Sequence, residues 1–117
     1  DLGCGDGRIL IEAAKRYGCR GVGIEIDPDR ARVARQAVAD AGLSDRIRII
    51  TGDVLEFDPA QHGVTAMTAY LYPELLAQLA DTISQARVAA SPFHAVPGLS
   101  MEDHGNVWVY RSEGNSQ

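Results

Sequence analysis

The stretch DLGCGDG, residues 1–7, places three glycines within seven positions, directly after an acidic residue. A glycine-rich turn between a strand and a helix lets backbone amides approach a ligand closely at the carboxyl edge of a sheet. Apolar side chains then recur at helical spacing from Ile9 to Tyr17, and Gly18 stands where a C-terminal cap belongs. The stretch therefore predicts a ligand-binding turn that opens a helix.

The spacing of the glycines argues against a dinucleotide ligand. The dinucleotide fingerprint is G-x-G-x-x-G, and Arg8 occupies the position of its third glycine. No Gly-Lys-Ser/Thr follows the turn, which also excludes a P-loop. The turn is therefore expected to serve a ligand that carries no phosphate.

The rest of the chain alternates short β-rich runs with helical segments. We expect strands over 20–26, 46–51, 63–72, 86–93 and 106–111, and further helices over 28–41 and 73–83. Asp27 followed by Pro28 predicts an N-cap and a first helical residue. This alternation predicts an α/β domain over residues 1–111, built on a mainly parallel sheet with helices on both faces, and a frayed C-terminal tail over 112–117.

The glycine turn needs a strand in front of it, and residue 1 is not methionine. In sheets of this kind the strand that leads into the turn is central. We therefore expect that this first central strand is missing from the chain, which then begins inside a longer protein.

Three acids fall beside the expected strand ends. Glu25 could accept hydrogen bonds from both hydroxyls of a ribose, Asp53 beside Val54 could read an adenine edge, and Asp1 could hold an ammonium group. Together they describe a nucleoside attached to a cationic amino acid. Two of them also have plainer interpretations: Glu25 as a solvated strand end, and Asp53 as a turn former after Gly52.

DLGCGDG, GVGIEIDP and GDV resemble, in order and in spacing, the first three motifs of class I S-adenosylmethionine-dependent methyltransferases. The resemblance covers nearly the whole chain and implies a Rossmann-like sheet with one reversed strand near its end. It implies S-adenosyl-L-methionine as the cofactor. The residues that it assigns to this cofactor are Asp1, Gly3, Cys4 and Gly5 around the methionine part, Glu25 at the ribose, Asp53 with Val54 at adenine, and Ile26 as a further contact.

A closer resemblance rests on DLGCGDGRILIEAAK, AYLYPELL and the ending RVAASPF…NVWVYR. These stretches are similar to a compact group that includes the mitochondrial lysine methyltransferases of the ATP synthase c-subunit and the adenine nucleotide translocase. The resemblance implies an N-methyltransferase with Tyr70 and Tyr72 on the substrate side. For Tyr70, a packing role remains the alternative. Many amine methyltransferases carry Asn/Asp-Pro-Pro-aromatic where this chain has AYLYPE, which disfavours the exocyclic amines of DNA bases.

Composition limits the partners. A net charge of −5 argues against nucleic acid, because phosphate binding depends on clustered Lys and Arg. No apolar run approaches the ~20 residues of a membrane span. Cys4 and Cys19 form neither a disulfide framework nor a zinc pattern, so a cytoplasmic setting is expected. His62, His94 and His104 have no ligand spacing, and we expect no metal.

The sequence thus predicts a methyltransferase that acts on a protein lysine or a small-molecule nucleophile. No catalytic residue is assigned, since transfer from a sulfonium mainly requires that the nucleophile be positioned and desolvated. The alternative is a non-catalytic module that binds a nucleoside cofactor, or an inactive truncated remnant. The acids at all three expected strand ends favour the enzyme.

The first prediction concerns the ligand. S-adenosylmethionine and S-adenosylhomocysteine should bind the full-length protein, and NAD should not, because Arg8 replaces the glycine that a pyrophosphate requires. Isothermal titration calorimetry checks this. Binding of NAD without any response to S-adenosylhomocysteine would contradict it.

Overall fold

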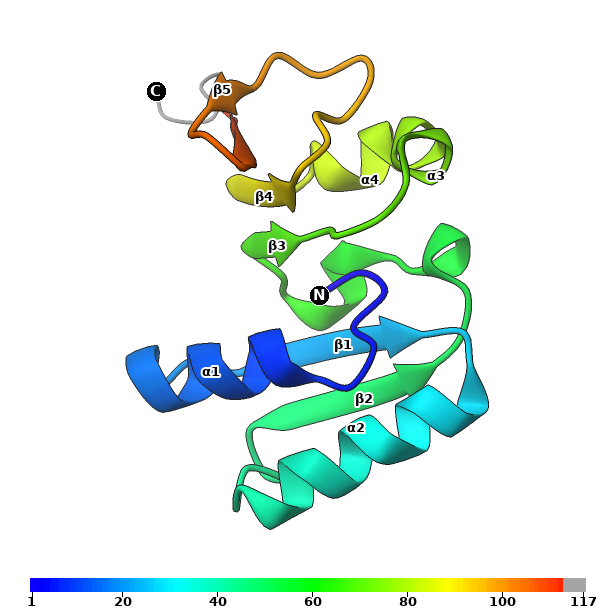
Figure 1. The fold of residues 1–117 in the computed structure, drawn as a ribbon, viewed down its shortest axis with the longest axis vertical. Coiled ribbons are helices and arrows are strands. Elements are labelled where there is room, and N and C mark those ends of the chain that lie inside the picture. Colours follow the sequence, from blue (N-terminus) through cyan, green and yellow to red (C-terminus); the bar gives the residue numbers. More distant parts are fainter. Residues whose placement is uncertain (113–117) are drawn as a thin grey trace. The chain divides into compact units, whose positions relative to one another are not determined.

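The computed structural model describes residues 1–112, and the chain divides into two compact units, Asp1–Phe57 and Asp58–Gln117 (Figure 1). Ser112 donates its backbone N–H to the carbonyl of Arg87 at 3.0 Å. Residues 113–117, which make up most of the expected tail, lie outside the described part.

The first unit alternates helices with parallel strands, as the sequence predicts. Its elements are α1 (Arg8–Tyr17), β1 (Gly21–Glu25), α2 (Pro28–Asp40), β2 (Ile47–Thr51) and the short 3₁₀ helix η1 (Val54–Glu56). β1 and β2 pair in parallel, with Gly21 opposite Ile47 and Glu25 opposite Thr51. Both strands therefore end at the same edge.

The predicted caps are confirmed. Gly18 has a φ of 65° and donates its N–H to the carbonyl of Ala14 at 2.9 Å. Asp27 precedes α2, and its Oδ1 accepts a hydrogen bond from the N–H of Asp29 at 2.9 Å, with Pro28 as the first helical residue. Both ends use local chemistry that the sequence alone specifies.

The residues that lead into the glycine turn run beside β1. Leu2 forms a parallel bridge with Ile24, whose N–H donates to the carbonyl of Asp1 at 3.1 Å. The N–H of Gly3 then donates to the carbonyl of Ile24 at 2.9 Å. The two residues before the glycine turn are therefore paired with β1. That a central strand of a longer protein leads into this turn stays a prediction.

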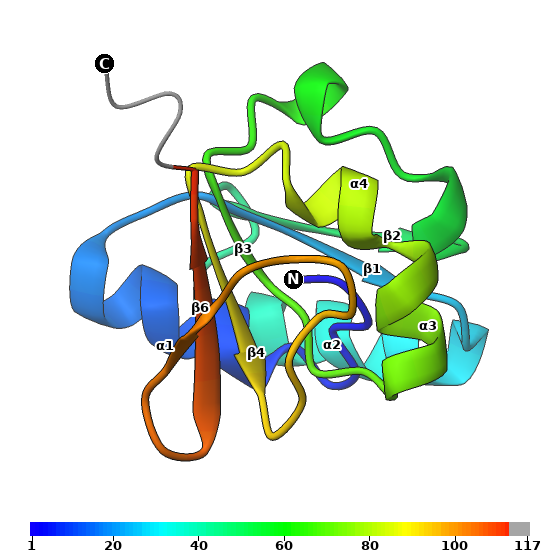
Figure 2. The same ribbon diagram turned by 90° about the horizontal axis from the view of Figure 1, so that it is seen from above.

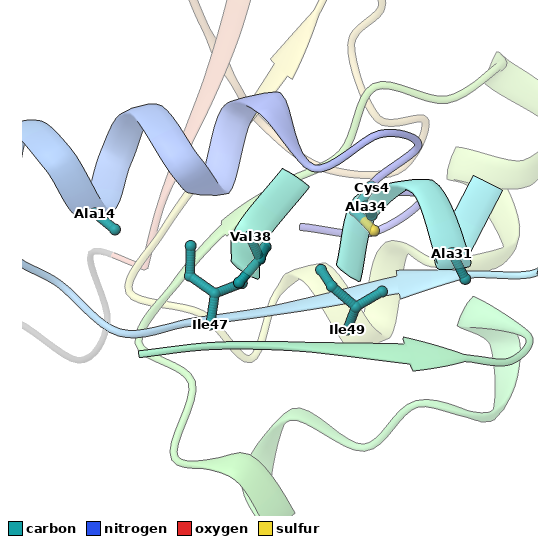
Figure 3. Packing of buried hydrophobic residues seen from close by; sticks show 7 residues of the cluster. All are labelled: Cys4, Ala14, Ala31, Ala34, Val38, Ile47 and Ile49. Atoms are coloured by element: carbon teal, nitrogen blue, oxygen red, sulfur yellow. The ribbon is translucent and has the colours of Figure 1, made fainter. Parts of the chain in front are cut away.

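Helices α1 and α2 share one core with the β1–β2 sheet (Figure 3). Its buried members are Cys4, Ala14, Ala31, Ala34, Val38, Ile47 and Ile49. Small side chains on both helices let the backbones come close to the strands. Tyr17, which belongs to the expected apolar face of the first helix, is instead 78% exposed, because it lies in the last turn beyond the packed part of α1.

The second unit contains a four-stranded sheet in the order β3-β4-β6-β5. Its elements are η2 (Pro59–His62), β3 (Ala66–Thr68), α3 (Pro73–Gln78), α4 (Ala80–Ile83), β4 (Val88–Pro92), β5 (Glu102–Asp103) and β6 (Val107–Arg111). β3 and β4 are parallel, whereas β6 runs antiparallel to β4 beside it (Figure 2). The expected reversed strand is therefore present. The two-residue β5, which pairs with β6, was not expected.

Two sequence predictions in this unit need correction. The strand expected over 63–72 is only Ala66–Thr68, because a 3₁₀ helix capped by Gly63 takes up its start and Tyr72 already leads into α3. The helix expected over 73–83 is broken at Leu79, which has φ −99° and ψ 3°. The N–H of Leu79 is shared between the carbonyls of Leu75 and Leu76, which is common where a helix tightens at its end.

Glycines in β1 allow the glycine turn and α1 to pack closely against the strand. A Cβ at position 23 would lie 2.8 Å from Cβ and Sγ of Cys4 and from Cδ1 of Leu10. A Cβ at position 21 would meet only Leu10, with its flexible Cδ2 at 2.8 Å and Cγ at 3.6 Å. Position 23 is the more constrained, since Cβ of Cys4 is tied to the backbone of the glycine turn.

The second prediction tests this packing. Gly23→Ala should lower the free energy of unfolding by about 1–3 kcal/mol, because the added methyl overpacks a closed contact. Gly21→Ala is the matched control and should cost clearly less, since the tip of Leu10 can rotate away. Chemical denaturation of the full-length protein measures both. Equal losses of unfolding free energy in the two variants, or no loss in Gly23→Ala, would refute the close approach of Cys4 to Gly23.

Candidate functional site

The glycine turn bends through backbone conformations that favour glycine. Gly3, Gly5 and Gly7 have φ values of 73°, 55° and 82°. The N–H of Gly7 donates to the carbonyl of Cys4 at 3.0 Å, which closes the turn. A Cβ on Gly7 would also lie 3.4 Å from Cβ of Ala34 in α2. All three predicted glycines are thus required by conformation, and Gly7 also by packing.

Glu25 joins the glycine turn to the start of α2. Its side chain is buried, and Oε1 accepts a hydrogen bond from the N–H of Gly5 at 2.9 Å. Oε2 accepts one from the N–H of Asp27 at 3.0 Å. Such bonds to an ionised carboxylate are stronger than neutral ones. The interpretation of Glu25 as a solvated strand end is therefore wrong.

Asp53 lies two residues after the end of β2, and its neighbour Gly52 is bonded to Glu25. The N–H of Gly52 donates to the carbonyl of Glu25 at 2.9 Å, and Oδ1 of Asp53 accepts from the N–H of Leu55 at 2.9 Å. Asp53 is thus the N-cap of η1 and forms the turn that its plainer interpretation predicts. The contact of Asp53 and the buried Val54 with adenine stays a prediction.

Two exposed aliphatic side chains lie just beyond these strand ends. Ile26, a predicted cofactor contact, follows β1 and is 67% exposed. Leu55 lies in η1, just after β2, and is 46% exposed. Sequence reasoning did not select Leu55, although a leucine two residues after Asp53 in a loop is a signal that could have been used. Apolar surface at this edge suits a planar base.

Cys4 contributes to the turn through its backbone and to the core through its side chain. Its N–H donates to the carbonyl of Ile24 at 2.9 Å. Burial raises the pKa of the Cys4 thiol above its ordinary value, so the thiol stays protonated at neutral pH. The side chain is therefore no nucleophile, and the predicted contact of Cys4 with the methionine part of a cofactor stays a prediction.

Asp6 and Arg8 form an ion pair at the start of α1. Nη2 of Arg8 lies 2.7 Å from Oδ2 of Asp6, and Oδ1 of Asp6 accepts from the backbone N–H of Arg8 at 3.2 Å. The Arg8 guanidinium holds the pKa of the Asp6 carboxyl below its usual range. A carboxylate thus occupies the helix N-terminus, where dinucleotide-binding folds hold a pyrophosphate.

The predicted substrate-side tyrosines belong to the second unit. Tyr70 and Tyr72 follow β3 and are 55% and 79% exposed. The ring of Tyr70 lies 5.5 Å from the ring of Phe93, which follows β4. Phe93 was not selected from the sequence, where SPF reads as the end of a strand. Tyr72 lies further along, directly before Pro73.

Residues 1–112 contain no group of three or more His, Cys, Asp or Glu side chains placed to bind a metal ion. His104 contacts Glu102 at 2.9 Å, and this carboxylate also pairs with Arg111. Within the described part of the chain, no helix combines the length and the apolar character needed to cross a lipid bilayer.

Comparison with known proteins relates this chain to methyltransferases. A family model described as the ANTKMT methyltransferase domain matches residues 1–99. A protein-lysine N-methyltransferase from Saccharolobus islandicus is 41% identical over 68 residues, which make up 57% of this chain and 42% of that protein. A ribosomal protein L11 methyltransferase from Pectobacterium atrosepticum is 31% identical over 110 residues, which make up 94% of this chain and 36% of the relative. The chain spans less than half the length of these curated relatives.

Among solved structures, an RNA methyltransferase from Salinibacter ruber in complex with S-adenosyl-L-homocysteine is similar, with a TM-score of 0.82 and 36% identity. The likeness covers 95% of this chain and 76% of that one. The predicted Rossmann-like α/β fold is thereby confirmed.

The third prediction separates Glu25 from Asp27. Glu25→Ala should lower the free energy of unfolding by about 2–3 kcal/mol, because two backbone amides lose a charged acceptor. Asp27→Ala should cost about 1 kcal/mol, as is usual for an N-cap. Only the change at Glu25 should also weaken S-adenosylhomocysteine binding strongly, by about ten- to a hundredfold. Denaturation curves and calorimetric titrations measure both effects, and the reverse order would show that the second motif is misaligned.

Proposed function

Because the chain belongs to the ANTKMT methyltransferase domain family, we propose that the protein is an S-adenosylmethionine-dependent methyltransferase whose acceptor is a protein lysine. The observation that carries the cofactor part of this proposal is the buried Glu25 carboxylate bonded to Gly5 of the glycine turn. It ties together two of the three motifs that characterise the cofactor site.

The residues at the strand ends of the first unit fit this cofactor. A carboxylate offers about four lone-pair sites, and Gly5 and Asp27 each donate to one oxygen of Glu25. Two lone pairs of the Glu25 carboxylate therefore remain to accept hydrogen bonds from the two ribose hydroxyls. Ile26 and Leu55 supply exposed apolar surface beyond neighbouring strand ends. Oδ1 of Asp6 already accepts from the N–H of Arg8 at the start of α1, which leaves this helix N-terminus less open to a pyrophosphate.

Charge favours a lysine acceptor over RNA. Residues 58–112, which include both candidate substrate-side tyrosines, contain five acidic residues, two arginines and no lysine. Such a segment attracts an ammonium group and repels a phosphate backbone. The relative from Saccharolobus islandicus is named for lysine methylation, whereas the neighbour from Salinibacter ruber is titled an RNA methyltransferase. RNA is therefore the alternative that an experiment must exclude.

S-adenosylmethionine, when bound, supplies a sulfonium methyl group as an activated electrophile. The lysine nitrogen gives one proton to solvent, and its lone pair forms the bond to the methyl carbon while the carbon–sulfur bond breaks. The electron pair of that bond stays on sulfur, so the products are N-methyl-lysine and S-adenosylhomocysteine. The protein needs to position and desolvate an amine whose ordinary pKa is about 10.4.

A cytoplasmic location is part of the same proposal. Cys4 and Cys19 are both free thiols. Unpaired cysteines are typical of reducing compartments. The partner is then a lysine-bearing cytoplasmic protein.

The fourth prediction concerns the acceptor. The full-length protein, incubated with methyl-tritiated S-adenosylmethionine, should label total protein from its source cells, and hydrolysis should release N-methyl-lysine. Chemical acetylation of the protein fraction should abolish the label, and total RNA should stay unlabelled. Glu25→Ala is the inactive control. Label in RNA alone, or no label with no binding of S-adenosylhomocysteine, would contradict the proposed function.

A further inference from the structure

Phe93 has a backbone conformation that large side chains rarely adopt. Its φ is +66°, and among residues 1–112 it is the one non-glycine residue with a positive φ. A bulky side chain in this left-handed region is a genuine outlier. Strained residues of this kind persist where neighbouring contacts enforce them, and they cluster at functional sites.

Three hydrogen bonds hold Phe93 in this conformation. The N–H of His94 donates to the carbonyl of Pro92 at 2.8 Å, which closes a three-residue γ-turn around Phe93. The hydroxyl of the buried Ser91 donates to the carbonyl of His94 at 2.5 Å. The N–H of Phe93 itself donates to the carbonyl of Asn106 at 2.6 Å. γ-Turns with a positive φ at the centre are rare and strained.

Packing does not account for this strain. Phe93 is 55% exposed, so the burial of this residue is incomplete and does not by itself explain the strained turn. A glycine at this position would adopt the same backbone without strain. The turn holds the centre of the Phe93 ring 5.5 Å from the centre of the Tyr70 ring, with 42° between the ring planes.

The two rings lie at an edge where ligands bind. Tyr70 follows β3 and Phe93 follows β4, and these strands are parallel, with Thr68 opposite Ala90. In open α/β sheets, ligands bind beyond the carboxyl ends of the strands. An exposed aromatic pair at this edge is therefore placed to contact a substrate.

We infer that Phe93, held by its γ-turn, forms with Tyr70 an aromatic surface that binds the lysine side chain of the acceptor. This inference rests on the proposed function and adds to it a residue that determines acceptor affinity. Aromatic faces attract ammonium groups and contact an alkyl chain equally well. The acidic excess of residues 58–112 adds long-range attraction for the same cation.

The fifth prediction uses a set of variants of the full-length protein. Phe93→Leu keeps apolar bulk without the aromatic face, and Phe93→Gly also removes the backbone strain. Phe93→Tyr restores an aromatic ring, and Tyr17→Leu changes an exposed tyrosine in α1 as a matched control. Each is measured for methylation of total protein from the source cells, for S-adenosylhomocysteine affinity and for the denaturation midpoint.

Phe93→Leu and Phe93→Gly should raise the apparent KM for the protein acceptor about three- to thirtyfold, the range expected for one cation–π contact. Their S-adenosylhomocysteine affinity should stay within twofold of wild type. The midpoint of Phe93→Gly should equal or exceed that of wild type, because strain is released. Phe93→Tyr and Tyr17→Leu should retain the wild-type KM.

Several outcomes would overturn the inference. An unchanged KM in Phe93→Leu, with an active wild type, would refute it and leave the proposed function intact. A lower midpoint of Phe93→Gly with an unchanged KM would show that the ring serves packing alone. A wild type that binds no S-adenosylhomocysteine, or that labels RNA and not protein, would instead refute the proposed function and the inference with it.

Discussion

The first unit is organised around the buried carboxylate of Glu25. A buried charge is costly unless hydrogen bonds replace the water it loses, and here the N–H groups of Gly5 and Asp27 each donate to one of its oxygens. The carbonyl of the same residue accepts from Gly52. One residue therefore connects the glycine turn, the start of α2 and the loop after β2. These are the three places where the motifs of the family lie.

This connection requires the backbones to approach closely. Gly23 in β1 leaves room for Cys4 of the glycine turn and for Leu10 of α1. Alanines at positions 31 and 34 let α2 pack tightly against the same core. The hydrogen bonds of Glu25 therefore depend on these small residues. Larger side chains would move the glycine turn away from β1 and take the N–H of Gly5 out of reach of the Glu25 carboxylate. Packing and polar chemistry depend on each other in this unit.

The second unit uses its sheet differently. The antiparallel β6 pairs with β4 as far as Pro92, and the carbonyl of Asn106, directly before β6, accepts the N–H of Phe93. The reversed strand thus helps to hold a strained turn at the carboxyl end of a parallel strand. The result is an exposed aromatic pair, Tyr70 and Phe93. We regard this as the most distinctive feature of the unit.

The sequence by itself determined the local features of this protein. The α/β alternation, the turn at residues 1–7, the cap at Asp27 and the cap at Gly18 depend on neighbours in the chain, and all are present. The strand expected over 63–72 was too long, because long-range pairing, which a linear pattern does not contain, decides where a strand stops. The helix expected over 73–83 keeps its bounds but is broken at Leu79.

Only the tertiary structure decided which partners the site residues have. Periodicity cannot show that Glu25 is buried against Gly5, since the two are brought together by the packing of α1 and α2 on one sheet. Nor does any pattern around Phe93 indicate a positive φ, because residues far along the chain, such as Asn106, help to impose it. The sequence specifies which groups are available at the strand ends. The distances between them arise from close packing.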